Sequence, residues 1–153
     1  MWDEIWSRRD RTLLLLIPTS EFRRQESFVH RLPHVRVIDW RKEFLKAVRP
    51  GQQFLNLKAQ SELDRLKACV KSNEGSILCT INTEYALTRF DPNERQTFWR
   101  GLRTDFPYCK SIIVFGVLNS PELLPCDLEQ WRTSSRLVNP EEFAGGGTDA
   151  QDN

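Results

Sequence analysis

Three continuous apolar segments, residues 12–17, 76–81 and 111–117, predict buried strands. None of them alternates between polar and apolar positions, which is typical of strands covered on both faces, as in a parallel sheet. Residues 35–39 predict a fourth strand with more exposure, and residues 136–138 predict a short fifth strand at an edge.

The segments between these strands have apolar residues at helical spacing. In the first of them, residues 21–32, Phe22, Gln25, Val29 and Leu32 share one face. The others are residues 40–48, residues 61–72 with Ser61 as the cap, and residues 91–106, which begin with an acid and a proline. Alternating strands and helices predict a three-layer α/β domain with a mostly parallel sheet of four to five strands.

The chain of 153 residues is long enough for one domain with a full core. We assign residues 12–138 to this single α/β domain. Residues 1–11 predict a lead-in helix or arm. Residues 139–153 contain three consecutive glycines followed by small and polar residues, which predicts a disordered tail.

The junction after the first strand is informative because residues 17–27 contain neither glycine nor lysine. In an α/β nucleotide-binding domain this junction carries a phosphate loop. Such a loop needs glycines so that backbone N–H groups can turn toward the phosphates, and a lysine that reaches the outer phosphates. The pattern therefore indicates a P-loop NTPase-like core that lacks a working phosphate loop.

The end of the 76–81 strand is the second position where nucleotide chemistry is expected. Magnesium-dependent hydrolysis favours an acid there, followed by a glutamate. This chain has Asn82 and then Glu84, and an uncharged amide binds a divalent cation poorly. Asn82 and Glu84 are interpreted as a remnant nucleotide site. The alternative is that Asn82 or Thr83 simply caps the next helix.

The stretch from residue 77 to residue 117 resembles the small P-loop-like accessory proteins of bacterial phage-exclusion (BREX) systems, of the BrxF type. The residues that carry the resemblance are Asn82, Glu84, Leu87, Phe90, Asp91 and Pro92. Members of that family have a phosphate loop after their first strand, where this chain has residues 18–27. The resemblance implies a small prokaryotic subunit within a larger defence or DNA-processing assembly.

Basic residues concentrate in the first third of the chain, although the net charge is only +1. Such a distribution allows a direct nucleic-acid-binding module as an alternative function. Free N–H groups near residue 20 could also hold an anion. The anion- or nucleic-acid-binding candidates are Thr19, Ser20, Arg23, Arg24, Arg31, Arg36 and Arg41.

A cryptic metal-dependent nuclease is the enzymatic alternative, since Asp39, Lys42 and Glu43 follow a predicted strand. Asp39 is equally suited to cap the helix that begins at Trp40. The four cysteines are not spaced as a zinc site and do not lie beside either histidine. We therefore expect no metal, no cofactor and no catalytic residue.

Aromatic and aliphatic residues outside the sheet pattern either cap the core or bind a partner. Trp2, Ile5, Trp6 and Trp131 are the partner-binding candidates. The charged N-terminal residues are unlike a signal peptide, and no apolar run is long enough to span a bilayer, which predicts a cytoplasmic protein without membrane contact.

The expected function is that of a non-catalytic accessory or adaptor subunit with a degenerate nucleotide-binding fold. Its partner would be a larger protein subunit or a second copy of the chain, in a prokaryotic anti-phage or DNA-associated complex.

Overall fold

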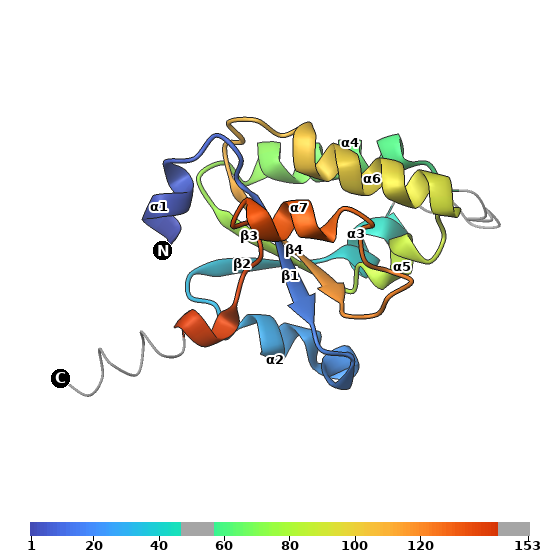
Figure 1. The fold of residues 1–153 in the computed structure, drawn as a ribbon, viewed down its shortest axis with the longest axis horizontal. Helices are drawn as coiled ribbons and strands as arrows, with labels where there is room; N and C mark the ends of the chain where they lie inside the picture. Colours follow the sequence, from blue (N-terminus) through green and yellow to red (C-terminus); the bar gives the residue numbers. More distant parts are fainter. Residues whose placement is uncertain (47–56, 144–153) are drawn as a thin grey trace.

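Four parallel strands form the centre of the molecule. The computed structural model describes residues 1–46 and 57–143. Across its sheet the order is β1 (Thr12–Ile17), β4 (Ile112–Leu118), β3 (Ile77–Ile81) and β2 (Val35–Asp39) (Figure 1). All four lie within one residue of the predicted bounds, and the predicted parallel sheet is confirmed.

A short fifth segment lies at the outer edge of β1. Leu137 pairs with Leu14 in parallel, the Leu14 N–H donates to Arg136 O at 2.8 Å, and the Val138 N–H donates to Leu14 O at 2.9 Å. The predicted short edge strand is therefore present as this single bridge, and β1 has a neighbour on each side.

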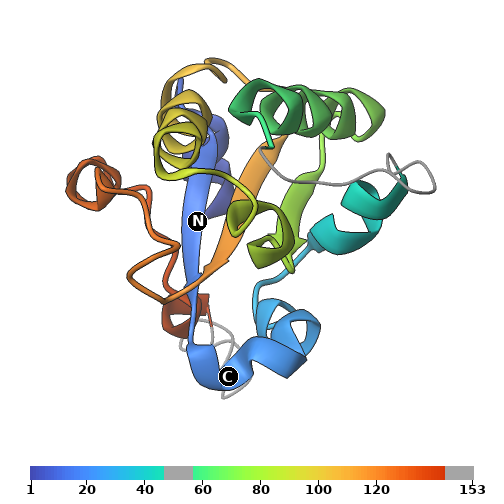
Figure 2. The same cartoon turned by 90° about the vertical axis from the view of Figure 1, so that its right-hand side faces the viewer.

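Helices cover the sheet from both sides, as predicted. Figures 1 and 2 show α4 (Ala59–Ser72) and α6 (Pro92–Thr104) side by side on one face, with η1 (Thr19–Arg24), a 3₁₀ helix, and α2 (Gln25–Val29) on the opposite side. The remaining helices are α1 (Trp2–Trp6), α3 (Trp40–Lys46), α5 (Glu84–Leu87) and α7 (Leu128–Thr133).

The helix predicted at Asp91 and Pro92 is confirmed, and its first turn also starts a second helix. The Asp91 carboxylate accepts from the Glu94 N–H at 2.8 Å, which satisfies an N–H without a partner in the helix. The Glu94 carboxylate in turn accepts from the Ala59 N–H at 2.9 Å. Because this long-range cap replaces the predicted cap at Ser61, α4 begins at Ala59.

The helix predicted over residues 21–32 is wrong in its first half. Residues 19–24 form the 3₁₀ helix η1, and α2 spans only Gln25–Val29. A 3₁₀ helix turns 120° per residue, so Phe22 leaves the predicted apolar face. Its side chain is 53% exposed, whereas Gln25, Val29 and Leu32 are buried as expected.

The two ends of the described chain pack against each other. Trp2 donates from Nε1 to Pro33 O at 2.9 Å and stacks on Phe143 with 5.0 Å between ring centroids. Residues 140–143 form a helical turn. This turn falls within the predicted tail, whose remaining residues 144–153 lie outside the described residues.

Candidate functional site

The carboxyl ends of the parallel strands meet at one edge of the sheet, which is where open α/β sheets bind their ligands. The segment after β1 is η1 and α2, β2 ends at Asp39, and β3 leads into Asn82. The two residues of the predicted remnant site and the predicted metal-binding acid Asp39 therefore come from neighbouring strands.

A hydrogen-bonded cluster fills this edge. The Asn82 N–H donates to Gln25 Oε1 at 2.8 Å, and Asn82 Nδ2 donates to Asp39 Oδ1 at 3.0 Å. Gln25 Nε2 donates to Glu84 Oε1 at 2.6 Å. These four side chains satisfy one another, so we call them the edge network.

Gln25 is the centre of the edge network and was not among the predicted site residues. Its side chain is only 4% exposed. It accepts a hydrogen bond from the Asn82 N–H and donates one to the Glu84 carboxylate, on either side of Thr83. A buried amide needs such partners because an unsatisfied one is costly. The signal in the sequence was a glutamine at an apolar-face position of the predicted helix.

Asn82 adopts a left-handed backbone conformation, with φ at 56°. Non-glycine residues in this region are uncommon, and asparagine tolerates it better than most. Thr83 occupies the N-cap position of α5, but its hydroxyl donates to Gly116 O at 2.5 Å instead of capping that helix. Thr83 therefore begins α5 as the sequence indicated, although its side chain does not form the capping hydrogen bond.

The Asp39 carboxylate accepts two hydrogen bonds. Besides Asn82, the Arg41 N–H donates to its Oδ1 at 3.1 Å, as expected for a residue that caps α3. Glu43 forms a surface ion pair with Lys46 at 3.3 Å. Within residues 1–46 and 57–143, no group of three or more His, Cys, Asp or Glu side chains could hold a metal ion.

Burial raises the pKa of Glu84, and the nearby Asp39 carboxylate raises it further, against the lowering effects of the Gln25 hydrogen bond and Arg41. Glu84 therefore binds its proton more tightly in the folded protein than in the unfolded chain. As pH rises from the pKa of Glu84 in the unfolded chain to its higher pKa in the folded protein, the free energy of unfolding must fall. Ionised Glu84 therefore lowers stability at neutral pH.

We expect Glu84→Gln to be more stable than the parent protein at pH 7, by less than about 1 kcal/mol because the side chain is partly solvated. The new amide keeps an oxygen for Gln25. The difference should vanish below about pH 3, where the carboxyl group is protonated in both the folded and the unfolded chain. Urea unfolding across pH measures it. Glu74→Gln, at an exposed site, is the matched control; equal gains from both variants would contradict the argument.

The anion-binding candidates do not form one patch. Thr19, Ser20, Arg23 and Arg24 are exposed on η1, and Arg41 is exposed at the start of α3. Arg31 lies at the other side of α2 and pairs with Glu141 at 2.7 Å. Arg36 on β2 is bonded to Asn73, which follows α4. Arg31 and Arg36 therefore lie apart from the basic residues of η1 and α3.

The predicted partner-binding residues lie mainly in the core. Ile5 and Trp131 are fully buried, and Trp2 is 9% exposed. Trp6 is half-buried beneath Arg11, whose guanidinium carbon lies 5.6 Å from the ring centroid. This placement favours the core-capping alternative over the partner-binding one for all four side chains.

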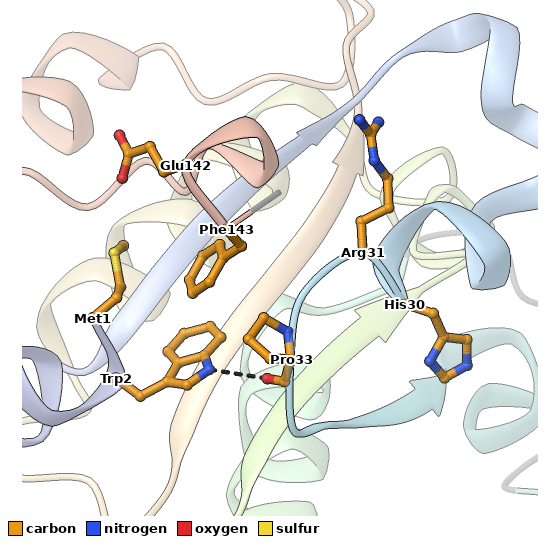
Figure 3. Close-up of a pocket in the computed structure, with 7 residues that line it drawn as sticks. All are labelled: Met1, Trp2, His30, Arg31, Pro33, Glu142 and Phe143. Atoms are coloured by element: carbon orange, nitrogen blue, oxygen red, sulfur yellow. Dashed lines mark hydrogen bonds between the residues drawn. The ribbon is translucent and has the colours of Figure 1, made fainter. Parts of the chain in front are cut away.

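A cavity of about 560 Å³ opens between the first two residues and the helical turn at residues 140–143. Figure 3 shows Trp2, Pro33 and Phe143 together along one side of it, with His30 and Arg31 on the other. Both of these basic residues face in-chain carboxylates, since His30 lies 3.8 Å from Glu26 and Arg31 pairs with Glu141. None of the residues that line the cavity belongs to the edge network.

Among the helices of residues 1–46 and 57–143, none has the length and apolar character needed to cross a membrane. Searches against family models, curated proteins and solved structures found no match to the chain.

Proposed function

We propose that this protein is a non-catalytic accessory or adaptor subunit built on a degenerate nucleotide-binding fold. Following the resemblance of residues 77–117, its setting would be a prokaryotic anti-phage or DNA-associated complex. Its partner would be a larger protein subunit or a second copy of the chain.

The strand order supports a P-loop-like core of the AAA type. With residues 136–138 counted as a fifth strand, the sheet reads 5-1-4-3-2. β1, which would lead into a phosphate loop, is then an inner strand. Its neighbour β4 is the strand that follows β3, the strand that would carry the metal-binding acid. This arrangement agrees with the interpretation of residues 17–27 and Asn82 as the two altered nucleotide positions.

The edge network is the observation that carries the proposal. In a nucleotide-binding domain the segment after β1 leaves its N–H groups open to phosphates. Here that segment inserts the buried Gln25 side chain toward β3, and Gln25 engages both Asn82 and Glu84. A triphosphate would have to displace this satisfied cluster without a lysine to compensate.

Calorimetric titration with ATP and magnesium tests the proposal. We expect no binding tighter than about 1 mM, an affinity of about 4 kcal/mol that surface charge alone can supply. Any weak heat should disappear at physiological salt, because exposed charges are screened there. A micromolar dissociation constant that persists at physiological salt would contradict the proposal.

A further inference from the structure

The surface over the edge network has an unusual composition. Phe22 is 53% exposed, and it is followed by two exposed arginines, Arg23 and Arg24. Arg41 and Lys42 are exposed at the start of α3. We call these five residues, Phe22, Arg23, Arg24, Arg41 and Lys42, the basic edge.

The edge network joins the two parts of the basic edge. Gln25, which directly follows Arg24, bonds to Asn82, and Asn82 bonds to Asp39. The same Asp39 oxygen accepts from the backbone of Arg41. The exposed residues of η1 and of α3 therefore flank one short chain of hydrogen bonds.

The charges at this edge are layered. The carboxylates of Asp39 and Glu84 are turned into the edge network, and the half-buried Glu21 reaches only Arg24, at 3.4 Å. On α2, the exposed Glu26 faces His30. Within the described part of the chain, Arg23, Arg41 and Lys42 have no ion-pair partner. The outermost layer is therefore positive.

Resting on the proposed function, we propose that the basic edge docks an acidic segment of a protein partner, with Phe22 entering an apolar part of that segment. An exposed aromatic residue beside arginines is the composition of binding hot spots. A run of phosphates fits less well, because the edge offers one exposed aromatic side chain and the carboxylates of Glu21, Asp39 and Glu84 lie just beneath its cations.

Fluorescence anisotropy with a labelled peptide of three Asp-Leu-Glu-Glu-Phe repeats tests this inference. The parent protein should bind the peptide, with affinity that falls as salt is raised. Phe22→Ala with Arg23→Glu should weaken binding about tenfold or more, equivalent to about 1.4 kcal/mol. Neither side chain makes a hydrogen bond in the described structure, so the variant should fold, which circular dichroism would verify.

The matched control is Tyr108→Ala with Arg9→Glu. It also removes an exposed aromatic side chain, which is 67% accessible, and reverses one exposed charge, away from the edge network. This control should bind the peptide as the parent does. Equal losses in both variants, or no binding of the peptide by the parent, would refute the docking surface.

Binding of a labelled oligothymidylate strand distinguishes a nucleic-acid site from a peptide site. If it binds more tightly than the peptide and depends on Phe22 and Arg23, the surface is a nucleic-acid site and the inference is wrong. The ATP titration is independent of both probes. Tight ATP binding would overturn the proposed function, whereas failure of the peptide alone would overturn only the docking surface.

Discussion

Replacing Gly116 by alanine should destabilise the protein by about 3 kcal/mol, near the upper end of overpacking effects. A Cβ atom at this position would lie 2.4 Å from Thr80 O, a backbone atom of the neighbouring strand β3, and 2.9 Å from Ile17 Cδ1. The Gly116 N–H and C=O are also bonded to the hydroxyls of Thr80 and Thr83. Strands β3 and β4 would have to separate at the centre of the sheet.

Urea unfolding monitored by circular dichroism measures this loss. Gly101→Ala is the informative comparison, because a Cβ there would meet the Leu63 side chain, at 2.5 Å from Cδ1. A leucine side chain can change rotamer, whereas the Thr80 backbone is fixed by the sheet. We therefore expect a smaller loss for Gly101→Ala. If the free energy of unfolding of Gly116→Ala lies within about 0.5 kcal/mol of the parent's, the close approach of β3 and β4 is wrong.

Arg136→Ala should cost about 3–4 kcal/mol, as expected when a buried cavity and an unpaired backbone oxygen are created together. The Arg136 side chain is buried, and its Nε donates to Thr12 O at 2.8 Å. Its guanidinium also bonds to the Thr12 hydroxyl and lies 4.5 Å from the centroid of the Trp131 ring. Burial lowers the pKa of Arg136 to about 10, so the group still carries its charge at neutral pH.

Amide hydrogen exchange gives this prediction a local test besides urea unfolding. The Val138 N–H donates to Leu14 O only while the fifth segment stays on β1, so its exchange should accelerate in Arg136→Ala. Arg132→Ala is the matched control, since Arg132 is exposed near the end of α7 and pairs there with Glu129. Arg132→Ala should lower the free energy of unfolding by less than about 1 kcal/mol. Similar stabilities for the two variants would show that Arg136 does not anchor the segment.

Much of the fold followed from local patterns. The unbroken apolar segments predicted β1, β3 and β4, because strands buried on both faces are mostly apolar, and residues 35–39 predicted the more exposed β2. The capping sequence at Asp91 predicted the start of α6, because the cap and its N–H lie three residues apart. The prediction failed at Phe22, because residues 19–24 form a 3₁₀ helix, whose period differs from that of the α-helix assumed from the spacing.

The candidate site was predictable only in part. Asn82 and Glu84 were identified by their place after an apolar strand, and the missing glycine and lysine by their absence from residues 17–27. The partners of these residues were not predictable, because Gln25 lies 57 residues from Asn82 and 59 from Glu84, and Asp39 lies 43 residues from Asn82. Helix and strand periodicity relate residues within one element, so they do not predict contacts between residues this far apart in the sequence.

The sequence by itself determined that this chain forms a parallel α/β sheet and that the segment after its first strand contains neither glycine nor lysine. Both properties depend on residue type and near-neighbour spacing. Only the tertiary structure decided that Gln25 fills the carboxyl edge, that the tryptophans near both chain ends pack inward, and that cations remain outermost around Phe22. These outcomes depend on which distant segments meet, and the meeting is set by packing of the whole core.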